Sequence, residues 1–60
     1  MNNTIYYQRR NGSIKFKYGA TGQEMMYVDY PFAAAYRLFK AKIGVKRAHL
    51  EKAEWLYWLP

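Results

Sequence analysis

The chain has 60 residues, of which 52% are hydrophobic and 20% aromatic, and its formal net charge is +6. This length allows one domain, residues 1–60, with little room for a pocket, and the absence of cysteine excludes disulfides and thiolate zinc sites. Because the chain has neither an apolar run of membrane-spanning length nor the pattern of a secretory signal, we expect a soluble, cytoplasmic protein.

The first element in chain order is a β-hairpin over residues 4–18 that turns at Asn11 and Gly12. Two runs of alternating character flank this pair, and Asn-Gly tolerates the positive φ angles of a type I′ turn. The turn sets the register and places Arg10 opposite Ser13. The predicted core face holds Ile5, Tyr7, Ile14, Phe16 and Tyr18. The predicted exposed face is basic and aromatic and holds Tyr6, Gln8, Arg10, Ser13, Lys15 and Lys17.

A third strand is predicted over residues 23–29, after a turn that contains two glycines. We expect Val28 to face the core and, by the period of two, Met26 to face it as well. Met25 and Tyr27 then join the exposed face beside the lysines of the hairpin. The two-glycine turn lacks the lysine and the strand-to-helix context of a phosphate-binding loop, so we interpret it as a turn only.

A helix is predicted over residues 31–43. Asp29 is a capable N-cap, Pro31 suits the first helical turn, and four alanines favour the helical state. Gly44 then occupies the C′ position, and Val45 can make the apolar contact of a Schellman motif. The apolar stripe has the spacing i, i+3, i+7, i+11 and consists of Phe32, Ala35, Phe39 and Ile43.

The C-terminal segment, residues 46–59, has two interpretations. Leu50, Ala53 and Tyr57 form a helical stripe, whereas the aromatic residues near the end also suit a short strand. We interpret the segment as a helix that starts near Arg47. The predicted fold is therefore α+β: a three-stranded antiparallel sheet packed on one face by a helix and followed by a second short C-terminal helix, in the order βββαα.

Basic residues gather in two clusters that contain no acid, one on the hairpin and one at the end of the helix. Cations bind phosphates, rings can stack on bases, and a β-ribbon can present Arg10 and Gln8 to base edges. We therefore predict a small nucleic-acid-binding or regulatory domain that uses the exposed face of its sheet. The alternative is a solvated surface whose cations keep a small domain in solution. The predicted nucleic-acid-binding residues are Tyr6, Gln8, Arg10, Lys15, Lys17, Tyr27, Arg37 and Lys40.

In its order of three antiparallel strands and a packed helix, the chain resembles small DNA-binding domains such as the plant AP2 domain and the arm-binding domain of phage integrases. The likeness is one of architecture, since no residue motif of either family occurs in the chain. It implies a DNA-binding domain and assigns no residue a role.

The second hypothesis is a protein-interaction module, such as a viral-type host-directed factor or a small virion component. Large aromatic side chains crowd the C-terminus, and tryptophan and tyrosine are common at interface hot spots. Self-association or partner binding, completion of the core and interfacial membrane anchoring are the alternatives for this segment. The predicted partner-binding residues are Trp55, Tyr57 and Trp58.

No group of residues in the sequence predicts catalysis. His49 is the only histidine, and a catalytic or metal role would require a nucleophile, a carboxylate or further ligands beside it. Glu24 begins a strand and Asp29 precedes the helix, so the two do not form a catalytic pair. We therefore expect no enzyme activity, no cofactor, no metal and no small-molecule substrate. The expected partners are a nucleic acid, another protein or a second copy of the chain.

Overall fold

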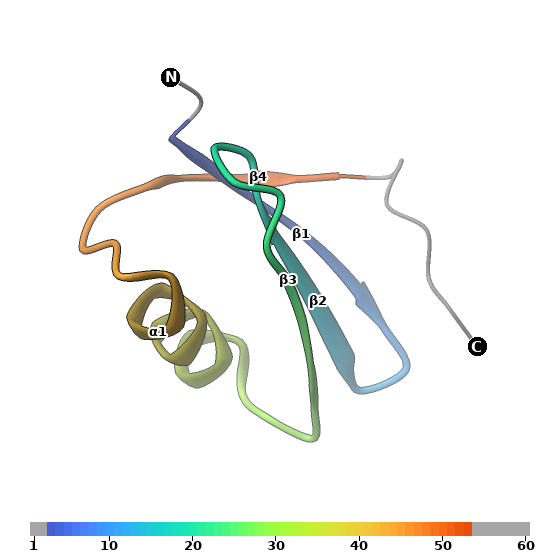
Figure 1. Ribbon diagram of the computed structural model, residues 1–60. Helices are drawn as coiled ribbons and strands as arrows, with labels where there is room; N and C mark the ends of the chain where they lie inside the picture. The colour runs from blue at the N-terminus through green and yellow to red at the C-terminus, as the bar shows by residue number, and fades with distance from the viewer. Residues whose placement is uncertain (1–2, 54–60) are drawn as a thin grey trace.

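The computed structural model describes residues 3–53, which form a four-stranded sheet and one helix (Figure 1). The elements are β1 (Thr4–Arg10), β2 (Ser13–Tyr18), β3 (Glu24–Val28), α1 (Phe32–Ile43) and β4 (His49–Lys52). The strands lie in the order β3-β2-β1-β4. The β1–β2 and β2–β3 pairs are antiparallel and the β1–β4 pair is parallel, so the sheet is mixed.

The hairpin predicted from the Asn-Gly pair is confirmed. Asn11 and Gly12 have φ angles of 46° and 79°, as a type I′ turn requires. Arg10 lies opposite Ser13, and the rest of the predicted register follows from this pairing. The core face of the hairpin is also as predicted: Ile5, Ile14, Phe16 and Tyr18 are buried, and Tyr7 packs against them.

Strand β3 is oriented opposite to the prediction. Tyr27 lies directly across from Ile14 in the β2–β3 register, and residues in such a pair share a face of the sheet. Because Ile14 faces the core, Tyr27 and Met25 do so as well. Tyr27 is accordingly only 9% exposed, whereas Met26 and Val28, predicted to face the core, are 47% and 51% exposed. The turn before β3 sets this register, and the apolar residues on both faces of β3 hid it from the sequence pattern.

The start of helix α1 also differs from the prediction. The helix begins at Phe32, its N-cap residue is Pro31 in an extended conformation, and no side chain caps it. Asp29 instead has a φ angle of 61° and lies in the connection after β3. Because the helical conformation is disfavoured for a residue that precedes proline, Tyr30 does not extend the helix toward Asp29. The carboxylate therefore lies too far upstream to act as the N-cap.

The end of the helix has the predicted Schellman motif. Gly44 has a φ angle of 75°, and its N–H donates to the carbonyl of Ala41 at 3.3 Å. The N–H of Val45 donates to the carbonyl of Lys40 at 3.0 Å. These two hydrogen bonds satisfy carbonyls that the helix itself leaves without a donor. Val45 also packs against the core.

The core is an aromatic cluster between the sheet and the helix. Phe16 and Phe39 are fully buried, and their rings stack with centroids 5.3 Å apart. Tyr27 and Phe32 meet the Phe16 ring edge-on at 6.1 and 5.6 Å. Large rings let a short chain bury enough apolar area to fold. The predicted helical stripe faces this cluster and comprises Phe32, Ala35, Phe39 and Ile43.

The predicted C-terminal helix is wrong over residues 49–52, which form β4. The N–H of His49 donates to Asn3 at 3.0 Å, that of Ala53 donates to Tyr7 at 2.9 Å, and Leu50 packs against the core. A short isolated helix pays a nucleation cost, whereas this segment pairs with the otherwise open edge of β1. The predicted three-stranded antiparallel sheet with two helices is therefore corrected to a four-stranded mixed sheet with one helix.

Candidate nucleic-acid interface

The outer face of the sheet, opposite the helix, is less positive than predicted. It carries the predicted residues Tyr6, Gln8, Arg10, Lys15 and Lys17. The ammonium of Lys15 lies 3.1 Å from one oxygen of Glu24, and that of Lys17 lies 3.8 Å from the other. The parallel strand β4 adds Glu51 to the same face, directly across from Tyr6. Two carboxylates therefore offset most of the positive charge on this face.

Burial also limits what the outer face can offer to a ligand. The Lys15 side chain is only 13% exposed. The amide oxygen of Gln8 is buried and has no hydrogen-bond partner. A buried amide oxygen cannot accept a hydrogen bond from a base edge, so the predicted reading role of Gln8 loses one of its two polar groups. Of the predicted residues on this face, Arg10 is the one classed as exposed.

Tyr27 does not belong to the outer face, and its predicted position there is wrong. Its ring lies on the core side of the sheet, where it meets Phe16 at 6.1 Å and Tyr30 at 5.5 Å. Burial, with a smaller contribution from Tyr30, raises the pKa of the Tyr27 hydroxyl. A ring in this position supports the aromatic cluster and is not available for stacking on a base.

Arg37 and Lys40 lie on the helix, three residues apart, and therefore share one side of it. Lys42 is two residues beyond Lys40 and points to a different side. The ammonium of Lys40 lies 4.6 Å from the centre of the Tyr36 ring, a cation–π distance. The predicted helical cluster is thus divided between two sides of α1.

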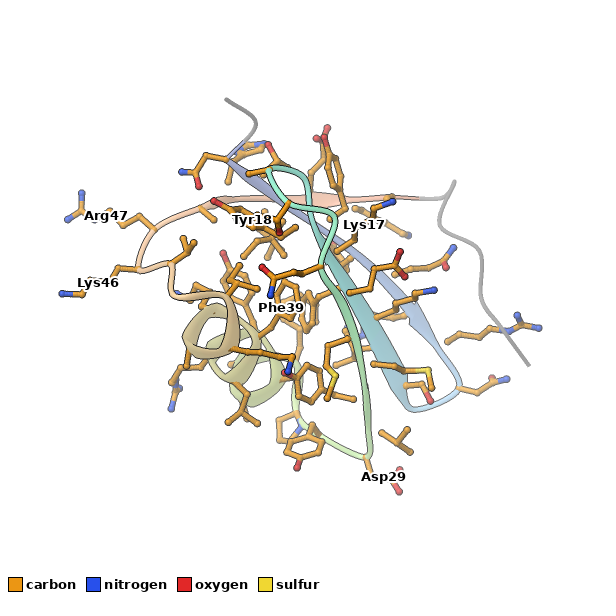
Figure 2. The ribbon with its side chains drawn as sticks, viewed as in Figure 1. Lys17, Tyr18, Asp29, Phe39, Lys46 and Arg47 are labelled. Atoms are coloured by element: carbon orange, nitrogen blue, oxygen red, sulfur yellow. The ribbon has the colours of Figure 1, made fainter. Side chains whose placement is uncertain are left out.

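The two predicted basic clusters lie on opposite sides of the molecule. The helix packs on the core face of the sheet, so the sheet itself separates the helical cations from those of the outer face. Figure 2 shows Lys46 and Arg47 projecting beyond the end of the helix, away from Lys17. One ligand surface cannot contact both clusters at once.

A row of rings and cations lies on the helix side of β1. The Tyr7 ring meets Phe32 edge-on at 5.0 Å, and Phe32 lies 6.3 Å from Tyr36. The guanidinium of Arg9 lies 5.7 Å from the centre of the Phe32 ring, and Lys40 lies over Tyr36. We call these five residues the cation–ring row. The three rings are half-buried, and burial raises the pKa of the Tyr36 hydroxyl.

Two further cations extend the cation–ring row. Lys52 lies directly across from Tyr7 in the β1–β4 pair and so faces the same side of the sheet. Arg37 lies one helical turn before Lys40. Both are exposed, and neither is ion-paired within residues 3–53. The helix side of β1 therefore presents Arg9, Arg37, Lys40 and Lys52 around three rings.

Sequence reasoning included Arg37 and Lys40 but missed Arg9 and Lys52. The hairpin register already placed Arg9 opposite Ile14, in phase with the apolar residues of the core face. Arg9 occupies a core-facing position of β1 but is charged, so its side chain has to extend past the helix into solvent. This was the signal that could have identified Arg9 from the sequence. Lys52 gave no such signal, since its position depends on the parallel pairing of β4.

The acids within residues 3–53 lie away from this surface. Glu24 and Glu51 are on the outer face. Asp29 lies beside the hairpin turn, where its N–H donates to the carbonyl of Gly12 at 3.0 Å. Helix α1 contains no acidic residue at all. Within the described part of the chain, the two carboxylates of the sheet therefore lie on the outer face, whereas Arg9, Arg37, Lys40 and Lys52 on the helix side have no ion pair.

Other predicted features add no further site to this surface. Trp55, Tyr57 and Trp58 lie outside the described residues, so their predicted role in partner binding stays a prediction. His49 is exposed on β4. Over residues 3–53, no cluster of three potential metal-binding side chains occurs, and α1 is too short and too polar to span a bilayer.

Comparisons with protein-family models, with curated proteins and with solved structures gave no match. A function for this chain therefore has to be inferred from its own residues and their geometry.

Proposed function

We propose that the protein binds nucleic acid through phosphate contacts made by the cation–ring row together with Arg37 and Lys52. The segregation of charge carries this proposal: among residues 3–53, the helix side of β1 gathers cations without an acid, while Glu24 and Glu51 lie on the opposite face. A polyanion is attracted to such a surface, and binding releases its condensed counterions. The proposal keeps the predicted class of ligand and moves the surface from the outer face to the helix side.

The geometry of the cation–ring row favours phosphate contact over base stacking. Arg9 and Lys40 already lie over the faces of Phe32 and Tyr36, so those faces are not open to a base. The same contacts restrict the two long side chains before a ligand arrives, and this lowers the entropy that binding would otherwise cost. Contacts of this kind position a nucleic acid but do not read its sequence. We therefore expect binding with little sequence preference.

The test is fluorescence anisotropy with labelled single-stranded and duplex oligonucleotides over a series of salt concentrations. The double variant Arg37→Gln, Lys40→Gln should bind more weakly than the unchanged protein. The slope of log K against log salt should become shallower by about 1.8 for duplex DNA and about 1.4 for a single strand, since two phosphate contacts are removed. Arg37 is exposed and Lys40 is half-buried over Tyr36, so the variant should lose at most about 1 kcal/mol of stability, the value of one such cation–π contact, and should remain folded.

The matched control is Lys15→Gln, Lys17→Gln, which removes the same charge from the outer face. We expect this variant to retain both the affinity and the salt slope of the unchanged protein. If it loses binding while the Arg37, Lys40 variant does not, the interface lies on the outer face and the proposed surface is wrong. If the unchanged protein does not bind any oligonucleotide at low salt, nucleic-acid binding itself is excluded.

A further inference from the structure

Strand β3 forms an open edge of the sheet. It pairs with β2 on one side, and no strand within residues 3–53 pairs with its other side (Figure 1). The N–H of Tyr18 donates to the carbonyl of Gln23, and the N–H of Asp29 donates to the carbonyl of Gly12. The backbone groups of residues 23 and 29 therefore point toward the hairpin. Because these groups alternate along an antiparallel strand, the N–H and C=O groups of residues 24, 26 and 28 point outward.

The side chains on this edge do not protect it from pairing. Met26 and Val28 are exposed on the outer face, and Met25 is 39% exposed on the other. Edge strands are usually protected by charged side chains, especially lysine, by proline or by a bulge. Strand β3 has no lysine or proline, and the charge of its one acidic residue, Glu24, is offset by Lys15 and Lys17 of β2. At the opposite edge of the sheet, β4 ends in the exposed charged pair Glu51 and Lys52. The β3 edge is therefore the one suited to receive another strand.

We propose that β3 pairs antiparallel with β3 of a second copy of this chain, with the two-fold axis between the two Met26 residues. In this register Met26 faces Met26 and Glu24 faces Val28, so every outward backbone group of residues 24, 26 and 28 meets a partner. The pairing doubles the four-stranded sheet into one continuous sheet and places both helices on the same face.

The edge is compatible with itself in charge and in hydrogen-bond register, which favours a second copy as the occupant. The symmetric register keeps the two Glu24 side chains apart, and the charge of each is offset by Lys15 of its own chain. A hollow of about 300 Å³ lies beside the edge and is lined by Lys15, Glu24, Met25 and Met26. The partner's apolar side chains would extend over this hollow and bury area that a 60-residue domain lacks in isolation.

The test is sedimentation and light scattering over a series of protein concentrations, starting from the 7.2 kDa monomer. The unchanged chain should reach twice this mass. Met26→Lys places two like charges directly opposite each other and should raise the dissociation constant at least about fivefold. Val28→Lys is the matched control: it adds the same charge to the same edge but faces the partner's Glu24, so dimerisation should persist.

A charge-swap pair checks the register independently of folding. Met26→Lys and Met26→Glu should each dimerise more weakly than the unchanged chain, and an equimolar mixture should dimerise more strongly than either variant alone, because lysine then faces glutamate. Circular dichroism confirms that each variant is folded before the mixture is made. A monomeric unchanged chain at all concentrations overturns the proposal. So does a dimer that Met26→Lys leaves intact, or a mixture that dimerises no more strongly than either variant alone.

Discussion

Replacing Phe16 by leucine tests whether the aromatic cluster holds the helix on the sheet. The Phe16 ring is 0% exposed and stacks on Phe39 at 5.3 Å. Leucine has about three fewer side-chain carbons, which at about 0.8 kcal/mol for each buried methylene corresponds to roughly 2 kcal/mol. A 60-residue domain has a free energy of unfolding of roughly 3–9 kcal/mol at about 0.05–0.15 kcal/mol per residue. The variant should therefore fold, with a large fraction of its stability lost.

Urea and thermal denaturation followed by circular dichroism measure this loss. The melting temperature should fall by roughly 8–16 °C, since about 1 kcal/mol corresponds to about 4–8 °C in a domain of this size. Tyr30→Leu is the matched control: it also replaces a ring that contacts Tyr27, but Tyr30 is 47% exposed and should cost less than about 1 kcal/mol. Equal losses in Phe16→Leu and Tyr30→Leu would refute the assignment of Phe16 to the centre of the core.

Three further predictions concern the helix end, the tyrosines and the fourth strand. Gly44→Ala should lower the free energy of unfolding by about 1 kcal/mol because alanine is strained at a φ of 75°. Gly44→Asn should lower it less, because asparagine tolerates the left-handed conformation better. If both variants were as stable as the unchanged chain, this prediction would be contradicted. Burial raises the pKa of Tyr27 and Tyr36, so the unfolded chain loses these protons first, and stability should be steady below the ordinary pKa of 10.0 and fall as pH rises above it. A double Tyr27→Phe, Tyr36→Phe variant should show a smaller fall in denaturation at alkaline pH, and an unchanged profile would count against the tyrosines as its source. Leu50→Lys should release β4 and speed hydrogen exchange at the Ala53 amide, which donates to β1, while an unaltered rate would show that Leu50 does not hold the strand.

The elements predicted well from the sequence are those whose signals are local. The Asn11-Gly12 pair readily adopts the positive φ angles of a type I′ turn. This turn fixes which residues of β1 and β2 lie opposite each other. Gly44 likewise adopts the left-handed conformation that ends the helix, with Val45 as its apolar contact. In both cases the deciding residues are neighbours in the chain, so their effect can be read without knowledge of the rest of the fold.

The candidate site was only partly predictable for the same reason. Arg37 and Lys40 were recognised as cations of a helix, but their neighbours across the layers were not. Arg9 lies over Phe32, and it belongs to the same row as Lys40 only because Phe32 and Tyr36 are neighbours on the helix. The outer face is less basic than predicted because Glu24 and Glu51 lie on it. The positions of both carboxylates depend on how the strands pair.

Composition and short-range pattern by themselves determined a small basic α+β chain with a hairpin and a helix that packs on it. Only the tertiary structure decided which way β3 faces and that residues 49–52 form a parallel strand. The physical reason is that β3 and the C-terminal segment have apolar residues compatible with more than one state. Their conformation is therefore chosen by contacts with distant segments, namely the register across the turn before β3 and the open edge of β1.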